Sequence, residues 1–308
     1  MPFTYPAPPP TIAGDLVTIS RFLNSPTLIA RRLRTLAEQR FISDALLTGR
    51  YEVVGGAVQF EQNESIFVDR AALSVAPGSS YPRSGLSEGA AQIAKVDKWG
   101  VDAPVTDESI KRRRMDPVTK AMAKTVNSVV NQVDSVALSL IASAVIQTQA
   151  VTAAWNAASG TAIVRDILLG KAKIYDLKQG FEPDTLAVDD TTWAYVTSDP
   201  VLSAAARRED TSSVVYSGVF PVIAGVKVLP SPNMPSGVHA ILLDSTQLGG
   251  MADEDLGGPG YASAAGVGVQ AKTIRDDDLE QWRVRARRVT VPVVLEPSSA
   301  LTFTGVLG

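Results

Sequence analysis

The clearest pattern of hydrophobic positions along the chain lies between Thr106 and Thr148. Apolar residues recur there at steps of three and four, which is the spacing of one face of an α-helix. Lys120 and Asn131 are among the polar residues that fall outside this stripe. The stripe comprises Val118, Met122, Val126, Val129, Val133, Val136, Leu140 and Ala144. The pattern predicts a short charged helix followed by one long helix with a single buried face.

The long helix is expected to begin at Pro117. A proline at the first helical position gives up an N–H group that has no helical partner there, and Asp116 before it can accept from the open N–H groups of the first turn. A helix from Pro117 to Gln147 would be roughly 45 Å long at 1.5 Å per residue. Such a rod is expected to carry the elements around it.

Both ends of the segment from Tyr51 to Trp99 alternate with a period of two, as β-strands do. Between them, from about Glu61 to Ala91, the chain is rich in glycine, serine and proline. A two-stranded ribbon is marginally stable alone, and a structureless loop of this length is unusual inside a compact domain. We therefore expect either a strand-rich subdomain packed on its own chain or a long hairpin that reaches over a neighbouring copy.

Helical and strand patterns mix between residues 151 and 244, which indicates an α+β or α/β middle domain. A helix is predicted to end at Gly180, and its apolar stripe comprises Ile163, Ile167, Leu168, Ala172 and Leu177. Short strands are predicted at Pro183 to Val188, Val219 to Val222, Val226 to Leu229 and His239 to Leu243.

The C-terminal region begins with a glycine-rich stretch, residues 249–268, which is predicted to be a surface loop. Its glycines only partly match a dinucleotide-binding loop, because no suitable helix follows. The tail then alternates, with Trp282, Val284 and Ala286 on one face and Arg283, Arg285 and Arg287 on the other. Acidic residues at 276, 277, 278 and 280 precede these arginines. Such neighbouring charge blocks are typical of a solvated edge or of pairing between identical subunits.

Composition narrows the chemistry that the chain can perform. The 308 residues include no cysteine and one histidine, so disulfides, thiolate metal sites, cysteine nucleophiles and two-histidine metal sites are excluded. His239 lies in an apolar strand context, and Asp189 with Asp190 is predicted to cap a helix. No phosphate-binding GxxxxGK motif occurs, and no apolar run is long enough to span a membrane. We therefore expect no enzyme activity, cofactor, metal or membrane association.

Basic residues gather at two places although the net charge is −3. Residues 1–50 begin with an extended arm that contains five prolines. They hold six arginines and three acids, a net charge of 6 − 3 = +3. Residues 111–114 form a second basic run. Both places are interpreted as solvated helix faces. The alternatives are contact with a polyanion or an acidic neighbouring subunit at the first place, and nonspecific phosphate contact at the second.

The order of these elements resembles the tailed-phage major capsid protein family, whose fold is shared with encapsulins. The similarity extends from about Ser20 to the end, through KWGVDAPVTDESIKRRRMDPVTKAMAKTVNSVVNQVDSVAL and QWRVRARRVTVPVVLEPSSALTFTGV. It implies an α+β phage major capsid protein fold with an N-terminal arm, an extended β-hairpin loop, a peripheral domain with a long spine helix, and an axial domain. The implied ranges are 1–50 for the arm and helix, 51–99 for the loop, 100–148 and 276–308 for the peripheral domain, and 149–275 for the axial domain.

The resemblance implies a structural protein without catalytic residues. It would self-assemble as hexamers and pentamers into the icosahedral head around the double-stranded DNA of a tailed phage. It would be made in the host cytoplasm and located in the virion. Expected partners are further copies of the chain, DNA bound without sequence specificity, and scaffolding, portal and decoration proteins. The short arm suggests that any scaffolding protein is separate. An encapsulin-type nanocompartment and a cytoplasmic α/β enzyme are the alternatives.

Two sets of residues are singled out for contacts in such a shell. The expected subunit-interface residues are Phe67, Tyr81, Arg83, Arg283, Arg285 and Arg287. The expected genome-facing residues are Arg31, Arg32 and Arg34.

Overall fold

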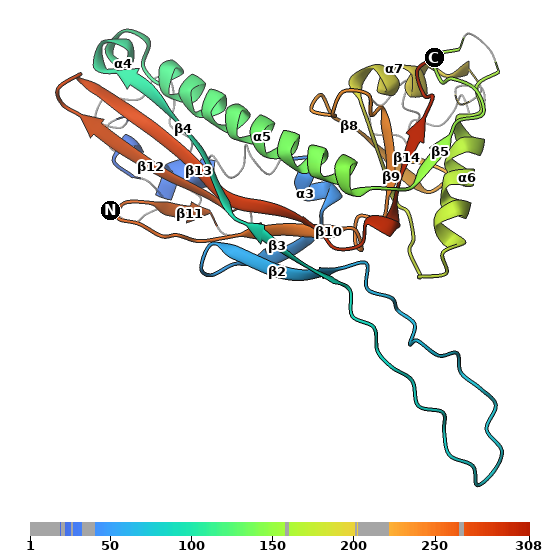
Figure 1. Ribbon diagram of the computed structural model, residues 1–308. Helices are drawn as coiled ribbons and strands as arrows, with labels where there is room; N and C mark the ends of the chain where they lie inside the picture. Colours follow the sequence, from blue (N-terminus) through green and yellow to red (C-terminus); the bar gives the residue numbers. More distant parts are fainter. Residues whose placement is uncertain are drawn as a thin grey trace, which may run out of the picture.

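The computed structural model describes residues 19, 22–25, 27–32, 41–157, 160–200, 202, 222–264 and 268–308. Two six-stranded sheets and one long helix make up most of this part of the chain (Figure 1). A separate two-stranded hairpin projects from the first sheet. The mixture of helices and strands confirms the predicted α+β class.

The long helix predicted from the hydrophobic stripe is α5, Asp116–Ala144. It follows the short charged helix α4, Asp107–Arg113, as predicted. Pro117 lies in the first turn of α5, although the helix starts one residue earlier than expected and ends before Gln147. The predicted capping role of Asp116 is wrong, because Met115 is the N-cap residue and the Asp116 carboxylate binds Lys120 at 2.7 Å.

The buried face of α5 matches the prediction in the first half of the helix and departs from it in the second. The five predicted positions up to Val133 are buried, whereas Val136, Leu140 and Ala144 are only half-buried. The positions that are buried in their place are Ala137, Leu138 and Ile141. The buried positions Val133, Ala137 and Ile141 advance in steps of four, which exceed one helical turn of 3.6 residues, so the buried face shifts around the helix toward its C-terminal end.

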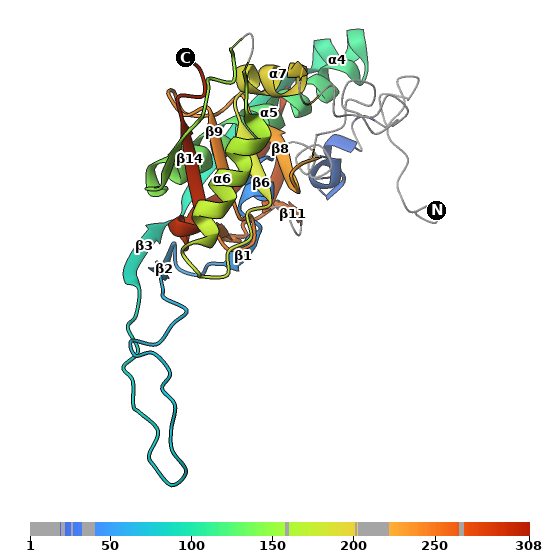
Figure 2. The same cartoon turned by 90° about the vertical axis from the view of Figure 1, so that its right-hand side faces the viewer.

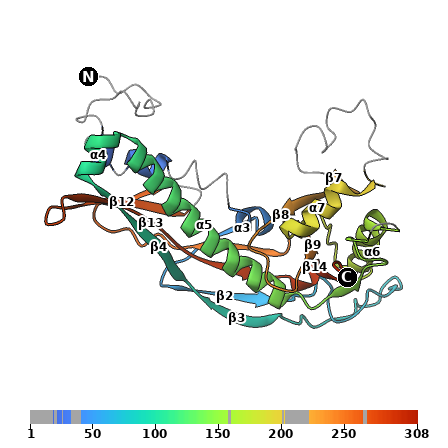
Figure 3. The ribbon, with the colours of Figure 1, turned by 90° about the horizontal axis from the view of Figure 1, so that it is seen from above.

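The first sheet lies against one side of α5 (Figure 3). Its central strand, β13, Gln281–Val294, pairs with β10, β12 and β4. The other strands are β1, Gly49–Glu52; β4, Asp97–Thr106; β10, Gly249–Asp253; β11, Ala262–Ala264; and β12, Val269–Asp276. The predicted two faces of β13 are confirmed, since Val284 and Ala286 are buried. The interpretation as a solvated edge is wrong, because β13 has partners on both sides.

The second sheet lies beyond the C-terminal end of α5 (Figure 2). Its strands, in spatial order, are β5, Thr148–Ala150; β14, Ala300–Thr304; β9, Ala240–Leu243; β6, Thr185–Val188; β8, Val226–Pro230; and β7, Val222–Ile223. Helix α6, Ile163–Tyr175, packs on β9 and β14, and α7, Asp190–Ser198, contacts β8. Three residues of the predicted α6 stripe, Leu168, Ala172 and Leu177, are exposed, whereas Gly170 and Ile174 face the core. The helix ends at Tyr175, before the predicted end at Gly180.

Each sheet combines strands from distant parts of the sequence. Strands β10, β11 and most of β12 lie in the first sheet, although their residues fall in the 149–275 range expected for the axial domain. Strand β14 lies in the second sheet, although it falls in the 276–308 range expected for the peripheral domain. The sheets therefore divide the chain differently from the sequence ranges.

The glycine-rich stretch from residue 249 was predicted to be a surface loop, and its first part is instead the buried strand β10. Strand β1 pairs with β10 in parallel, and Gly49 lies opposite Gly250. A Cβ atom on Gly250 would lie 2.4 Å from the backbone oxygen of Gly49. These glycines are therefore needed for the close approach of two strands, which local sequence does not distinguish from a loop.

A hairpin formed by β2, Ala57–Gln62, and β3, Ala90–Lys95, carries residues 63–89 away from the body (Figures 1 and 2). These residues contain no strand and are almost all exposed. This confirms the predicted long hairpin and contradicts the alternative of a subdomain packed on its own chain. We call residues 63–89 the extended loop.

Candidate subunit-contact surfaces

The extended loop exposes large apolar side chains that its own chain does not cover. Phe67 is 59% exposed and Tyr81 is 83% exposed, and Arg83 is exposed as well. The other apolar side chains that the loop exposes are Ile66, Val68, Leu73 and Leu86. Contiguous exposed apolar surface on a soluble protein is typical of an interaction site.

The two limbs of the extended loop are joined about halfway along its length. The side chain of Ser84 accepts a hydrogen bond from the backbone N–H of Arg70 at 2.9 Å, and the side chain of Ser87 donates to Asp69. The backbone N–H of Asp69 also donates to the carbonyl oxygen of Gly85. The loop is therefore a connected ribbon.

The root of the extended loop is attached to the end of β13. The Gln62 side-chain amide and the Asn63 backbone N–H donate to the carbonyl oxygens of Val294 and Leu295, both at 3.1 Å. The Glu64 N–H donates to the Glu296 carboxylate at 3.2 Å. The direction in which the loop leaves the body is thus fixed by the first sheet.

The three arginines predicted at subunit contacts lie side by side on the face of the first sheet that points away from α5. Arg285 donates two hydrogen bonds to the Asp102 carboxylate, at 2.6 and 2.7 Å, and this interaction lowers the pKa of Asp102. Arg283 lies 3.8 Å from both Asp102 and Asp276. All three side chains are partly exposed.

Arg287 connects this face to the glycine-rich segment after β10. Its guanidinium donates to the Gln270 side chain at 2.7 Å and to the carbonyl oxygen of Gly257, and it lies 3.7 Å from the centre of the Tyr261 ring. Sequence reasoning missed Tyr261, which no periodic pattern marks. Arg285 and Arg287 therefore have partners within the subunit, and their role between subunits stays a prediction.

A buried charged cluster that the sequence did not reveal joins the first sheet to α3, Ser43–Leu46. Arg288 is fully buried and donates to Asp44 and Asp253, with both pairs at 3.0 Å. Its guanidinium also lies 4.7 Å from the centre of the Phe41 ring. The strand alternation contains the missed signal, because position 288 is on the same inward face as 284 and 286.

Asp134 provides a second link between α5 and the segment before β1. Its buried carboxylate accepts hydrogen bonds from the backbone N–H groups of Ile42, at 3.2 Å, and Ser43, at 2.9 Å. Burial raises the pKa of Asp134 above its ordinary value of 3.8. The carboxylate thus satisfies two donors that a hydrophobic helix face would leave unpaired.

The described residues of the N-terminal region pack against the first sheet. Ile29 and Ala30 are buried, whereas the predicted genome-facing residues Arg31 and Arg32 are exposed. The third, Arg34, lies outside the described residues.

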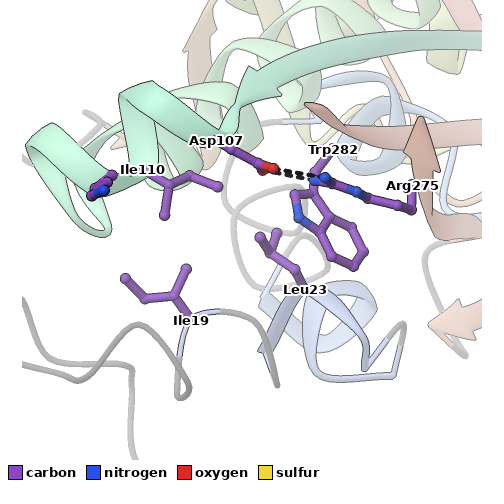
Figure 4. A pocket seen from close by; sticks show the side chains of 7 residues that line it. Ile19, Leu23, Asp107, Ile110, Arg275 and Trp282 are labelled. Atoms are coloured by element: carbon purple, nitrogen blue, oxygen red, sulfur yellow. Dashed lines mark hydrogen bonds and ion pairs between the residues drawn. The ribbon is translucent and has the colours of Figure 1, made fainter. Parts of the chain in front are cut away.

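A cavity of about 380 Å³ lies where α4 and the β12–β13 hairpin meet the N-terminal region (Figure 4). Its apolar walls are Ile19, Leu23, Ile110 and Trp282. Lys111, Asp107 and Arg275 complete the lining. Arg275 donates two hydrogen bonds of 2.7 Å to Asp107 and lies 5.4 Å from the centre of the Trp282 ring.

The residues considered for chemistry have structural partners. Asp189 caps α7 by accepting from the Thr192 N–H at 2.9 Å, as predicted, and its other oxygen lies 2.9 Å from Nδ1 of His239. The described ranges contain no group of three or more histidine, aspartate or glutamate side chains placed to hold a metal ion. Within the same ranges, no helix is long and apolar enough to cross a membrane.

Solved capsid structures share this arrangement of elements. The capsid structure of cyanophage P-SCSP1u matches with a TM-score of 0.62 and 13% identity, covering 86% of this chain and 88% of that one. A structure from Microbacterium phage Oxtober96 matches with a TM-score of 0.57 and 12% identity, over 86% and 90% of the two chains. A virus-like particle from Pyrococcus furiosus matches with a TM-score of 0.56 and 9% identity, over 89% and 97%. These likenesses confirm the phage major capsid protein fold and its occurrence in other shell-forming particles.

The sequence itself gives the family. No curated protein sequence matches the chain. A family model described as phage capsid protein matches residues 89–303, which run from the end of the extended loop through β14 and make up more than two thirds of the chain. The chain therefore belongs to the phage capsid protein family, as a structural protein of the virion shell.

Proposed function

We propose that this protein is the major capsid protein of a tailed phage, which self-assembles as hexamers and pentamers into the icosahedral head around double-stranded DNA. The observation that carries the assembly part of the proposal is the extended loop. Its two limbs are joined by hydrogen bonds, it is anchored at its root, and it presents apolar side chains that its own subunit leaves exposed. Burying a large apolar side chain such as Phe67 stabilises a contact by about 1.5–3 kcal/mol. We therefore expect the loop to pack against another copy of the chain.

Within this function we assign each sheet a place in the subunit. The first sheet with α5 forms the peripheral domain, and the second sheet with α6 and α7 forms the axial domain around the centre of each hexamer or pentamer. This assignment narrows the extended loop from the expected 51–99 to residues 63–89 with the hairpin strands β2 and β3, because β1 and β4 pair within the first sheet. It moves β10, β11 and β12 to the peripheral domain and β14 to the axial domain, because strands in one sheet share a core.

The interface role proposed for Phe67, Tyr81 and Arg83 rests on their exposure on the extended loop. For Arg283, Arg285 and Arg287 it rests on their partial exposure side by side on one face of the first sheet. Arg31, Arg32 and Arg34 are proposed to contact the packaged DNA, since arginine binds phosphate without reading sequence. Neutralising these last three should reduce DNA retention and leave shell formation unchanged.

Deletion of residues 61–91 tests the assembly proposal. We expect the shortened chain to be a folded subunit that no longer forms closed shells, as measured by sedimentation and electron microscopy. Circular dichroism of the unassembled subunit checks folding. Normal shells from the deleted chain would show that the loop is dispensable. A wild-type chain that stays a stable monomer, with and without a scaffolding protein, would contradict the capsid function as a whole.

The content of the particles distinguishes the phage head from a nanocompartment. Particles isolated from infected cells should contain double-stranded DNA and should include portal and decoration proteins. Particles that hold protein cargo in place of DNA would favour an encapsulin-type shell. A small oligomer that gains stability from a small-molecule ligand would favour an enzyme.

A further inference from the structure

We propose that the cavity beside α4 is a docking site for a second copy of this chain, and that it receives the β12–β13 turn of that copy. The inference rests on the proposed shell function and adds a contact separate from the extended loop. We call residues 277–280 the acidic turn and residues 111–114 the basic end of α4.

The cavity combines an apolar interior with a basic rim. Ile19, Leu23 and Ile110 are almost fully buried in its walls, and Trp282 covers another side (Figure 4). Lys111, Asp107 and Arg275 complete the lining. Because Arg275 is paired with Asp107, the positive charge that an incoming segment would meet comes from Lys111 and its neighbours on α4. An apolar pocket rimmed by charge is typical of an interface site that takes one apolar anchor with charged neighbours.

The basic end of α4 supplies four exposed positive charges next to this cavity, namely Lys111, Arg112, Arg113 and Arg114. Among the described residues, no ion pair or side-chain hydrogen bond involves any of the four. Repulsion among such close charges is relieved when an acidic segment binds. The partner that fits is therefore an apolar residue flanked by carboxylates.

The acidic turn has this composition. Leu279 is 65% exposed and lies between Asp277, Asp278 and Glu280. The Asp277 side chain is 86% exposed, although it also contacts Arg275 at 2.8 Å. A leucine at the tip of a turn with carboxylates on both sides complements the cavity and its basic rim in both shape and charge.

The turn of the same chain is fixed next to the cavity. The Asp107 N–H donates to the Glu280 carbonyl oxygen at 3.0 Å, and the Asp107 carboxylate holds Arg275. These bonds attach the turn to the first residue of α4 and leave Leu279 exposed. Leu279 is therefore presented to another molecule, while the cavity is open to a turn from outside.

Helix α4, which borders the cavity, and the β12–β13 turn lie at one end of the subunit, far from the second sheet (Figures 1 and 3). A contact between them joins copies by this end. Because the two patches differ, each copy gives its turn to one neighbour and takes the turn of another, a head-to-tail contact that forms a ring when the rotation between copies closes.

Charge exchange tests the contact in the full chain. Arg112→Glu with Arg113→Glu, and separately Asp277→Lys with Asp278→Lys, should each lower the yield of closed shells at least about tenfold, since like charges would face each other. All four substitutions in one chain should restore the yield. Lys124→Glu, an exposed charge reversal on α5, is the matched control and should assemble like the wild type. Electron microscopy and sedimentation measure the yield.

Either of two results would overturn the inference: normal shells from both reversed chains, or no recovery in the combined chain. Both results would leave the proposed shell function intact. Failure of the wild-type chain to form shells would instead contradict the shell function itself. If a reversed chain fails to fold, Leu279→Ser replaces it, since this exposed substitution should spare folding and still reduce the yield. Normal assembly of Leu279→Ser would also count against the contact.

Discussion

Arg288 and Asp44 lie 244 positions apart in the chain, yet two hydrogen bonds join them, from Nη1 to Oδ2 at 3.2 Å and from Nη2 to Oδ1 at 3.0 Å. Arg288 is fully buried and also binds Asp253 of β10. One side chain of β13 thus connects α3, the neighbouring strand and the core.

Arg288→Ala should lower the free energy of unfolding by about 3–5 kcal/mol, because it leaves two carboxylates without their buried cation. Urea denaturation of unassembled subunits measures this change. Lys120→Ala breaks the exposed ion pair with Asp116 and serves as the control, with an expected cost below about 0.5 kcal/mol. Equal effects of the two substitutions would show that the buried cluster contributes no more than a surface pair.

Asp134 predicts a dependence of stability on pH. Because burial raises the pKa of this carboxyl in the folded state, the folded protein binds its proton more tightly than the unfolded chain does. The stabilising contribution is full below the unfolded value of 3.8 and is lost as the pH rises through the folded pKa. The free energy of unfolding of the wild type, minus that of Asp134→Asn, should therefore fall as the pH rises from about 4 to about 7.

Asp102 should contribute a pH dependence of stability with the opposite sign, so Asp102→Asn is the matched comparison. Its folded pKa is lowered by the hydrogen bonds from Arg285, so its contribution is present above 3.8 and is lost as the pH falls through the folded value. The free energy of unfolding of the wild type, minus that of Asp102→Asn, should therefore fall as the pH is lowered. If the two stability differences changed with pH in the same direction, the pKa of Asp134 would not be raised by burial while that of Asp102 is lowered by Arg285.

Gly250→Ala should destabilise the subunit by about 1–3 kcal/mol, because the new methyl group overlaps the Gly49 carbonyl and pushes β1 from β10. Thermal unfolding measures the loss. Gly78→Ala in the extended loop meets no atom within 4 Å, and only its positive φ opposes the change, at a cost of about 1 kcal/mol. A larger effect at Gly78 would be inconsistent with the close strand approach.

Pro117→Ala should change the free energy of unfolding by less than about 1 kcal/mol, because a first-turn residue needs no N–H partner. Ser128→Pro in the middle of α5 should cost about 3 kcal/mol or more, because it removes a helical hydrogen bond and clashes with the preceding turn. Chemical denaturation of both variants compares the two positions. Severe unfolding of Pro117→Ala would mean that α5 begins elsewhere.

Periodicity predicted the parts of this fold that depend on neighbours along the chain. The two faces of β13, the proline-marked start of α5 and the hairpin around the extended loop follow from spacing alone. The order of elements was enough to indicate the family. These features repeat over many residues, so a single exception does not hide them.

The features that were missed depend on partners far away in sequence. Asp134 looks like an interruption of an apolar face until the N–H groups of Ile42 and Ser43 are placed beside it. Strand alternation puts Arg288 on the inward face of β13, but nothing near it in sequence indicates that Asp44 and Asp253 would surround it. No local pattern states which remote segment will supply a charge or a donor.

The chain passes between the two sheets three times, from α5 to β5, from β9 to β10 and from β13 to β14. If any one of these crossings were cut, the other two would still join the two halves of the subunit covalently. Tension applied to one half is divided among three covalent connections. In the proposed shell, each subunit would therefore stretch as a single mechanical unit.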